Sequence, residues 1–310
     1  MSEFLLGGQA VMEGVMMRGP TVMAVAVRMQ NGEIAVERLA IPQLSPRFSF
    51  MKWPVLRGIR SLWQALVLGF KAIGRSTELA DTSSSEESAL GKSSIAGAMI
   101  VAVCLSIGLF FLLPLALTQT LGHVIQSVND SPLLFNLIES ALRLAVFLLY
   151  LVAIRLLPDV KRFFQYHGAE HKVIYAFEAG EPLDVEHAKS KSPYHPRCGT
   201  NFLMTVMIIA MLVISITPHD VSVIAKAGWR VLLIPVIAGL SFELIRLSVK
   251  SKRAFLQRLV VGPGMFLQRL TAIEPNEEQI KVALEALNAV DLVIAVPSPA
   301  EKVLVQAAAS

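Results

Sequence analysis

IAGAMIVAVCLSIGLFFLLPLAL, residues 95–117, is the stretch that decides the fold class of this chain. It carries no charged side chain, and as an α-helix rising about 1.5 Å per residue it can cross about 30 Å of hydrocarbon. The rest of the chain agrees, because 54% of its 310 residues are hydrophobic and only 17% are charged. We therefore predict an α-helical integral membrane protein with about four transmembrane helices and a small mixed α+β cytoplasmic lobe.

Three further apolar stretches are candidate spans: Leu133–Leu157, Phe202–Thr217 and Trp229–Val249. The middle one is near the lower length limit, so a re-entrant segment is the alternative there. Glu139 and Arg143 are four residues apart, and Glu243 and Arg246 are three apart, so each pair can satisfy itself on its own helix. Such pairs indicate either a structural clamp between helices or a polar pathway.

Lysine and arginine set the expected orientation. They are frequent before residue 95 and between residues 158 and 200, and absent between residues 118 and 132. The positive-inside rule then places both termini, and the segment between residues 158 and 200, in the cytoplasm. The first long apolar run begins near residue 95, so we expect no cleavable signal peptide.

The sequence divides into six segments: residues 1–75, 76–94, 95–157, 158–200, 201–249 and 250–310. In the first, Thr21–Met29 and Glu33–Ile41 alternate in polarity around Asn31-Gly32, which predicts a β-hairpin with a type I′ turn. Residues 53–73 follow as an amphipathic helix, either on the inner leaflet or in the lobe core. Residues 76–94 form a Ser-rich linker, and residues 275–287 a helix that Asn276 caps.

The run YHGAEHK, residues 166–172, is the most informative motif for function. On a helix, His167 and His171 lie on one face, one turn apart, and both imidazoles can reach a single cation. Glu170 stands beside them, as the general base does in inverted zincins. The alternative is a solvated or hydrogen-bonded helix face without metal.

A second cluster, HPRC at residues 195–198, offers the remaining ligands. If His195 and Cys198 both bind, the site is a closed tetrahedral His3Cys centre that holds the lobe together. If only one binds, a position stays open for water, and Glu170 can take its proton. Glu178 and Glu181 are alternative third ligands. The donor set points to a divalent metal, namely zinc.

Four motifs together resemble the YqhQ-like family of bacterial membrane proteins of unknown function: GGQAVMEGVMMRGP, YHGAEHK, HPRCGTNF and PG…LQRLTAIEPNEEQIKVALEAL. The resemblance covers most of the chain outside the Ser-rich linker and the tail, and it implies a metal-dependent enzyme in the bacterial inner (cytoplasmic) membrane. The residues to which it points are Glu13, Arg18, His167, Glu170, His171, His195, Arg197 and Cys198.

We therefore expect a zinc-dependent hydrolase with Glu170 as base and Arg197 as a clamp for developing negative charge. Because Cys198 is close to the third span, the substrate is expected to be lipid-linked or delivered by the bilayer. The alternatives are a non-enzymatic scaffold or adaptor with a structural metal, and a small transporter. A homo-oligomer is compatible with the sequence, whereas no nucleic-acid-binding module is visible.

Overall fold

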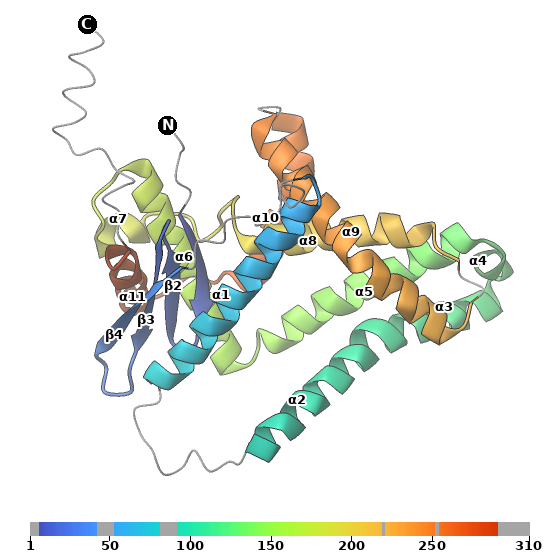
Figure 1. The fold of residues 1–310 in the computed structure, drawn as a ribbon, viewed down its shortest axis with the longest axis horizontal. Coiled ribbons are helices and arrows are strands. Elements are labelled where there is room, and N and C mark those ends of the chain that lie inside the picture. The colour runs from blue at the N-terminus through green and yellow to red at the C-terminus, as the bar shows by residue number, and fades with distance from the viewer. Residues whose placement is uncertain (1–5, 42–52, 81–91, 219–220, 252–253, 291–310) are drawn as a thin grey trace, which may run out of the picture.

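The computed structural model describes residues 6–41, 53–80, 92–218, 221–251 and 254–290. The chain folds into a lobe around a small sheet and a group of apolar helices beside it (Figure 1). The fold is mostly helical, which confirms the predicted class. The C-terminal tail, the Ser-rich run at 83–88 and residues 42–52 lie outside the described residues.

The sheet is an antiparallel meander of four strands in sequence order: β1 (Gly7–Val11), β2 (Gly14–Arg18), β3 (Val22–Arg28) and β4 (Ile34–Ala40). Strands β3 and β4 form the expected hairpin, with Val25 opposite Glu37. The expected type I′ turn is wrong, because that turn needs φ > 0 at both central residues and only Gly32 has it, at 87°. Asn31 instead accepts a hydrogen bond from the Glu33 amide.

Both faces of the sheet are covered, which explains why β3 is buried along nearly its whole length. On one face lies α1 (Leu56–Ala80), which contributes Leu68 and Ala72 to a core with β2 and β3. On the other lie α6 (Pro158–Ala179), the short α7 (Val185–Lys189) and α11 (Glu277–Asn288). The lobe thus joins segments far apart in the sequence around one sheet (Figure 1).

Helix α11 begins as predicted. Asn276 accepts the amide of Gln279, and the Gln279 side chain returns a bond to the Asn276 amide, which is a capping box. Helix α1 runs to Ala80, so residues 76–80 belong to it and not to the expected linker. It also exposes a second apolar face, in which Trp63 and Phe70 are 66% and 72% exposed.

Three helical stretches of the described residues are long and apolar enough to cross a membrane: Ile100–Val124, Pro132–Ile154 and Ile224–Ser248. The first combines α2 (Lys92–Ile107), a π-helical turn (Gly108–Leu112) and α3 (Leu113–Val124); α4 (Gln126–Asp130) leads into α5 (Pro132–Ile154). The third lies within α9 (Val223–Lys250). The apolar helix α8 (Gly199–Ser215) is shorter, and α10 (Ala254–Thr271) packs beside it.

The expected pairing of Glu243 with Arg246 is not the one the structure makes. Glu243 instead accepts two hydrogen bonds from Arg57 of α1, at 2.7 and 2.5 Å. The correction has a simple cause: α1 packs against α9 and brings a guanidinium to this carboxylate, which spacing along α9 cannot reveal.

The other predicted pair, Glu139 with Arg143, is present, and a third residue joins it. Glu139 binds Arg143 at 2.6 Å and also Arg230 of α9 at 2.5 Å. Arg143 further donates to the carbonyl of Phe110, in the π-helical turn, at 3.0 Å. A π-turn disturbs the regular helical hydrogen bonds, so this guanidinium satisfies an acceptor in an apolar helix.

Candidate metal site

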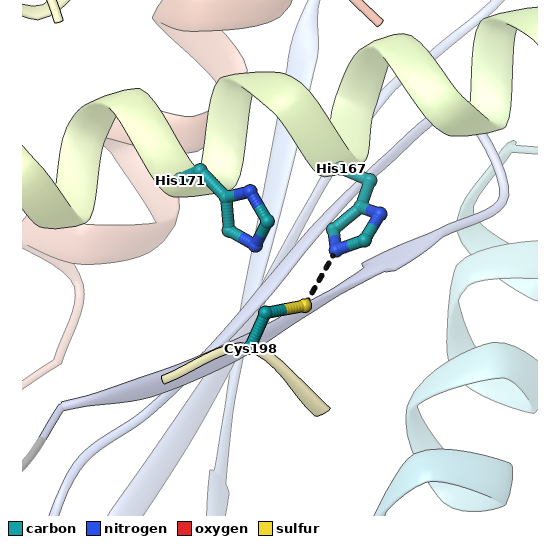
Figure 2. Close-up of side chains that lie close together, drawn as sticks. All are labelled: His167, His171 and Cys198. Atoms are coloured by element: carbon teal, nitrogen blue, oxygen red, sulfur yellow. Dashed lines mark hydrogen bonds between the residues drawn. The ribbon is translucent and has the colours of Figure 1, made fainter. Parts of the chain in front are cut away.

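The candidate site is built on the middle of α6, where the chain has no solvated helix face. His171 is 1% exposed and His167 is 9% exposed, because the helix lies between the sheet and the segment leading to α8. Figure 2 shows the two rings pointing from one face of α6 toward Cys198. Their centroids are 4.4 Å apart, as the one-turn spacing predicts.

Backbone carbonyls fix the tautomers of both histidines. His167 donates from Nδ1 to the carbonyl oxygen of Thr271 at 2.7 Å, and His171 donates from Nδ1 to that of Pro193 at 2.6 Å. A carbonyl only accepts, so each Nδ1 carries a proton, and in the neutral ring Nε2 presents a lone pair. Metal-binding histidines are held in this way by their second nitrogen.

The Nε2 atoms face the space in front of Cys198. The His167 Nε2 lies 3.0 Å from the Cys198 Sγ, whereas the buried His171 Nε2 has no hydrogen-bond partner among the described residues. One ligand atom from each of these three residues lies within 4.8 Å of the other two. Ligand atoms about 3.5 Å apart are what tetrahedral zinc requires, so small rotations of the side chains suffice.

Burial and helix geometry prepare these groups for a cation. Burial, together with the neighbouring His167, lowers the pKa of His171 to about 2, which keeps its imidazole neutral. Burial raises the pKa of the Cys198 thiol, opposed by hydrogen bonds from Thr200. Cys198 also caps α8, and a helix N-terminus favours the thiolate that a metal needs.

Glu170 lies at the same site but is enclosed. Its Oε2 is 3.5 Å from the His171 Nε2, and burial raises its pKa to about 8. On its other side is Gly8 of β1, where an added Cβ would come within 2.5 Å of the Glu170 Oε1. Glycine at position 8 therefore makes the room for this carboxyl group, which explains a glycine that the sequence alone leaves without a role.

His195 and Arg197 stand beside this group. The Nδ1 of His195 accepts from the Arg197 amide at 3.3 Å, and its Nε2 faces Glu178 at 3.4 Å. Arg197 also forms an ion pair with Glu178. His195 is not part of the group that His167, His171 and Cys198 form, and its ring centroid lies 5.8 Å from that of His171. Burial lowers the pKa of His195 to about 4.

The other acidic and motif residues lie elsewhere in the lobe. Glu181 binds Lys191 at 2.5 Å. Glu13 lies in the turn between β1 and β2 and pairs with Arg162 near the start of α6. Arg18 ends β2 and lines a cavity with Arg197, described below.

Sequence reasoning missed three residues that hold the site. Lys172, 2% exposed, donates to the carbonyls of Lys189 and Lys191 and pairs with Glu274, so it ties the end of α7 and the loop after it to α6. Gln268 of α10 binds the backbone of His195 through both amide atoms, at 2.7 and 2.8 Å. The sequence offered one signal for Lys172, namely that this lysine directly follows the candidate ligand His171.

The third is Gly168. A Cβ there would lie 2.1 Å from the carbonyl oxygen of Ile273, whose amide donates to the carbonyl of Phe164. The glycine thus lets the segment after α10 pass close to α6 and brings the Thr271 carbonyl to His167. A glycine that costs helix propensity is here required by a backbone contact.

Comparison with known proteins assigns the family. Residues 53–292 match the model described as "Protein of unknown function (DUF1385)". The chain belongs to the DUF1385 family. It is also similar to "Uncharacterized protein YqhQ" of Bacillus subtilis (strain 168), at 35% identity over 294 residues, with 91% of each chain covered. No solved structure matches this DUF1385 protein. The resemblance to YqhQ-like proteins is confirmed, and neither name states an activity.

Proposed function

We propose that this DUF1385 protein is a zinc-dependent hydrolase that acts on a membrane-associated substrate at the cytoplasmic face of the bacterial inner membrane. The observation that carries the proposal is the convergence of two imidazole lone pairs on the Cys198 sulfur, with both Nδ1 atoms already bonded to carbonyls. Two nitrogens and a sulfur are a donor set that suits zinc.

Three protein ligands leave room for catalysis. His167, His171 and Cys198 would hold the cation, whose bound form would supply Lewis acidity and acidify a water molecule. Glu170 would accept the proton, since a nearby cation lowers a carboxyl pKa that burial alone raises. Arg197 would stabilise developing negative charge, with Glu178 and His195 holding it in place.

A structural site in a membrane scaffold is the second candidate, and one distance favours it. The 3.5 Å between the Glu170 Oε2 and the His171 Nε2 also suits two ligands of one cation. Glu170 would then be the fourth ligand, and no position would remain for water.

Metal content and hydrolysis together separate these functions. We expect one zinc per chain in the full-length protein in detergent, measured by elemental mass spectrometry, and its loss in His167→Ala and Cys198→Ser. His187→Ala is the matched control, because His187 is an exposed histidine that binds Asp184. A wild-type protein that takes up no stoichiometric metal after incubation with zinc would refute the proposal.

Glu170→Gln distinguishes the enzyme from the scaffold. The hydrolase proposal expects full zinc content in this variant with loss of hydrolysis, followed with 4-nitrophenyl phosphate and 4-nitrophenyl acetate as chromogenic probes. The loss is expected to be about a hundredfold or more, as for removal of a general base. Loss of zinc together with Glu170 would instead support the scaffold.

A further inference from the structure

An apolar groove of about 650 Å³ opens beside Cys198. Four elements form it: α1, the start of α8 with the residues before it, the last turns of α9, and α10. Its volume lies within the range of small-molecule sites, and its lining is largely apolar, with Leu62, Phe202, Phe242, Ile245 and Val260 among the residues. The groove therefore suits a hydrocarbon chain better than a polar solute.

The charged residues of the groove are all basic. Arg197 and Arg246 line it, and no aspartate or glutamate is among its described lining residues. A second cavity of about 580 Å³ shares Arg197 and Phe242 with the groove and adds Arg18. Arginine forks match phosphate oxygens, so the end of the groove near Cys198 is complementary to a phosphate.

Two of the helices that line the groove also expose apolar side chains to the surroundings. Helix α1 exposes Trp63 and Phe70, and α10 exposes Phe255 and Leu259. Arg246 lies near the end of the candidate span Ile224–Ser248, where a cationic side chain reaches the headgroups. A chain in the bilayer can thus enter the groove between two helices that already present apolar side chains to it.

We propose that this groove binds a lipid phosphate, with the hydrocarbon chain along α9 and α10 and the phosphate between Arg197 and Arg246, beside Cys198. That this lipid is the substrate rests on the proposed hydrolase. Hydrolysis would join the oxygen of water to phosphorus and break the bond from phosphorus to the lipid oxygen. The proton that Glu170 takes from the water would pass to that departing oxygen.

Binding of a fluorescent lysophosphatidic acid to the full-length protein in detergent tests the groove, with anisotropy as the readout. Arg246→Gln removes the charge, and Ala65→Phe fills the groove from α1. We expect each to weaken binding about tenfold or more, because a charge-assisted hydrogen bond or a filled pocket changes affinity by at least that factor. Arg258→Gln and Val67→Phe are matched controls on exposed positions outside the groove.

Competition against the fluorescent lipid by three unlabelled compounds identifies which part of the ligand is recognised. Zinc content is measured on every variant. We expect unlabelled lysophosphatidic acid to compete best, lysophosphatidylcholine less well, and inorganic phosphate least. Groove variants that bind like their controls, or inorganic phosphate that competes as well as the lipid, would overturn the proposal. Groove-dependent binding by a protein without zinc would support the groove while refuting the hydrolase.

Discussion

Gly168→Ala sets two opposed effects against each other. In an ordinary helix the change stabilises by about 1 kcal/mol, because alanine has the higher helix propensity. Here the new Cβ would lie 2.1 Å from the carbonyl oxygen of Ile273, so the segment after α10 must move away from α6. Overpacking costs about 2 kcal/mol, and the bond from the Ile273 amide to Phe164 adds about 1 kcal/mol.

The net expectation is therefore destabilisation by about 2 kcal/mol, which lowers the melting temperature by about 4 °C in a chain of this size. Zinc content should fall as well, since moving this segment also shifts the end of α10, where the Thr271 carbonyl orients His167. Thermal unfolding of the protein in detergent, followed by intrinsic fluorescence, measures the first effect, and elemental analysis measures the second.

Gly74→Ala is the matched control. Gly74 lies inside α1, where an added Cβ meets nothing within 4 Å, so only the gain in propensity remains. We expect its melting temperature to be unchanged or higher by about 2 °C. If both variants shift the melting temperature equally, the close contact between α6 and Ile273 does not cause the destabilisation expected for Gly168→Ala.

Two further predictions concern buried charges. Lys172→Met should destabilise the protein by about 3 kcal/mol and lower its zinc content, because two backbone carbonyls and a carboxylate lose their partner. An unchanged melting temperature would contradict this expectation. Glu139→Gln should destabilise the protein by about 3 kcal/mol, because Arg143 and Arg230 both lose the carboxylate with which they pair among the apolar helices. Adding Arg230→Gln to this variant should restore part of the lost stability. A double variant no more stable than the single one would argue against this coupling.

Local pattern was enough for the elements of the fold and for part of the site. Apolar runs predicted the spans, strand alternation predicted the β3–β4 hairpin, and Asn276 marked the start of α11. The spacing of His167 and His171 placed their rings together, because that relation lies within one helical turn.

Two predictions failed for different reasons, one because the partner comes from another element and one because the turn is longer than its Asn-Gly dipeptide indicates. Sequence spacing paired Glu243 with Arg246, but α1 supplies Arg57 from 186 residues away. The turn at Asn31-Gly32 was assigned a type I′ geometry, whereas five residues connect the two strands and only the glycine adopts positive φ.

The candidate site shows the same division. His195 and Cys198 are equivalent from the sequence, since both are potential ligands in one short run. In the folded chain Gln268 binds the backbone of His195 and Glu178 faces its Nε2, while Cys198 at the start of α8 lies with the two histidines.

The sequence by itself determined that this is a membrane protein and that two imidazoles share a helix face, because hydrophobicity and helical periodicity are properties of neighbouring residues. Tertiary structure alone decided that the His171 Nε2 has no hydrogen-bond partner among the described residues, that a side chain at position 8 or 168 would clash, and where the groove lies. Those features depend on contacts such as that of His167 with Thr271, 104 residues away, and such contacts exist only once the helices and the sheet have packed.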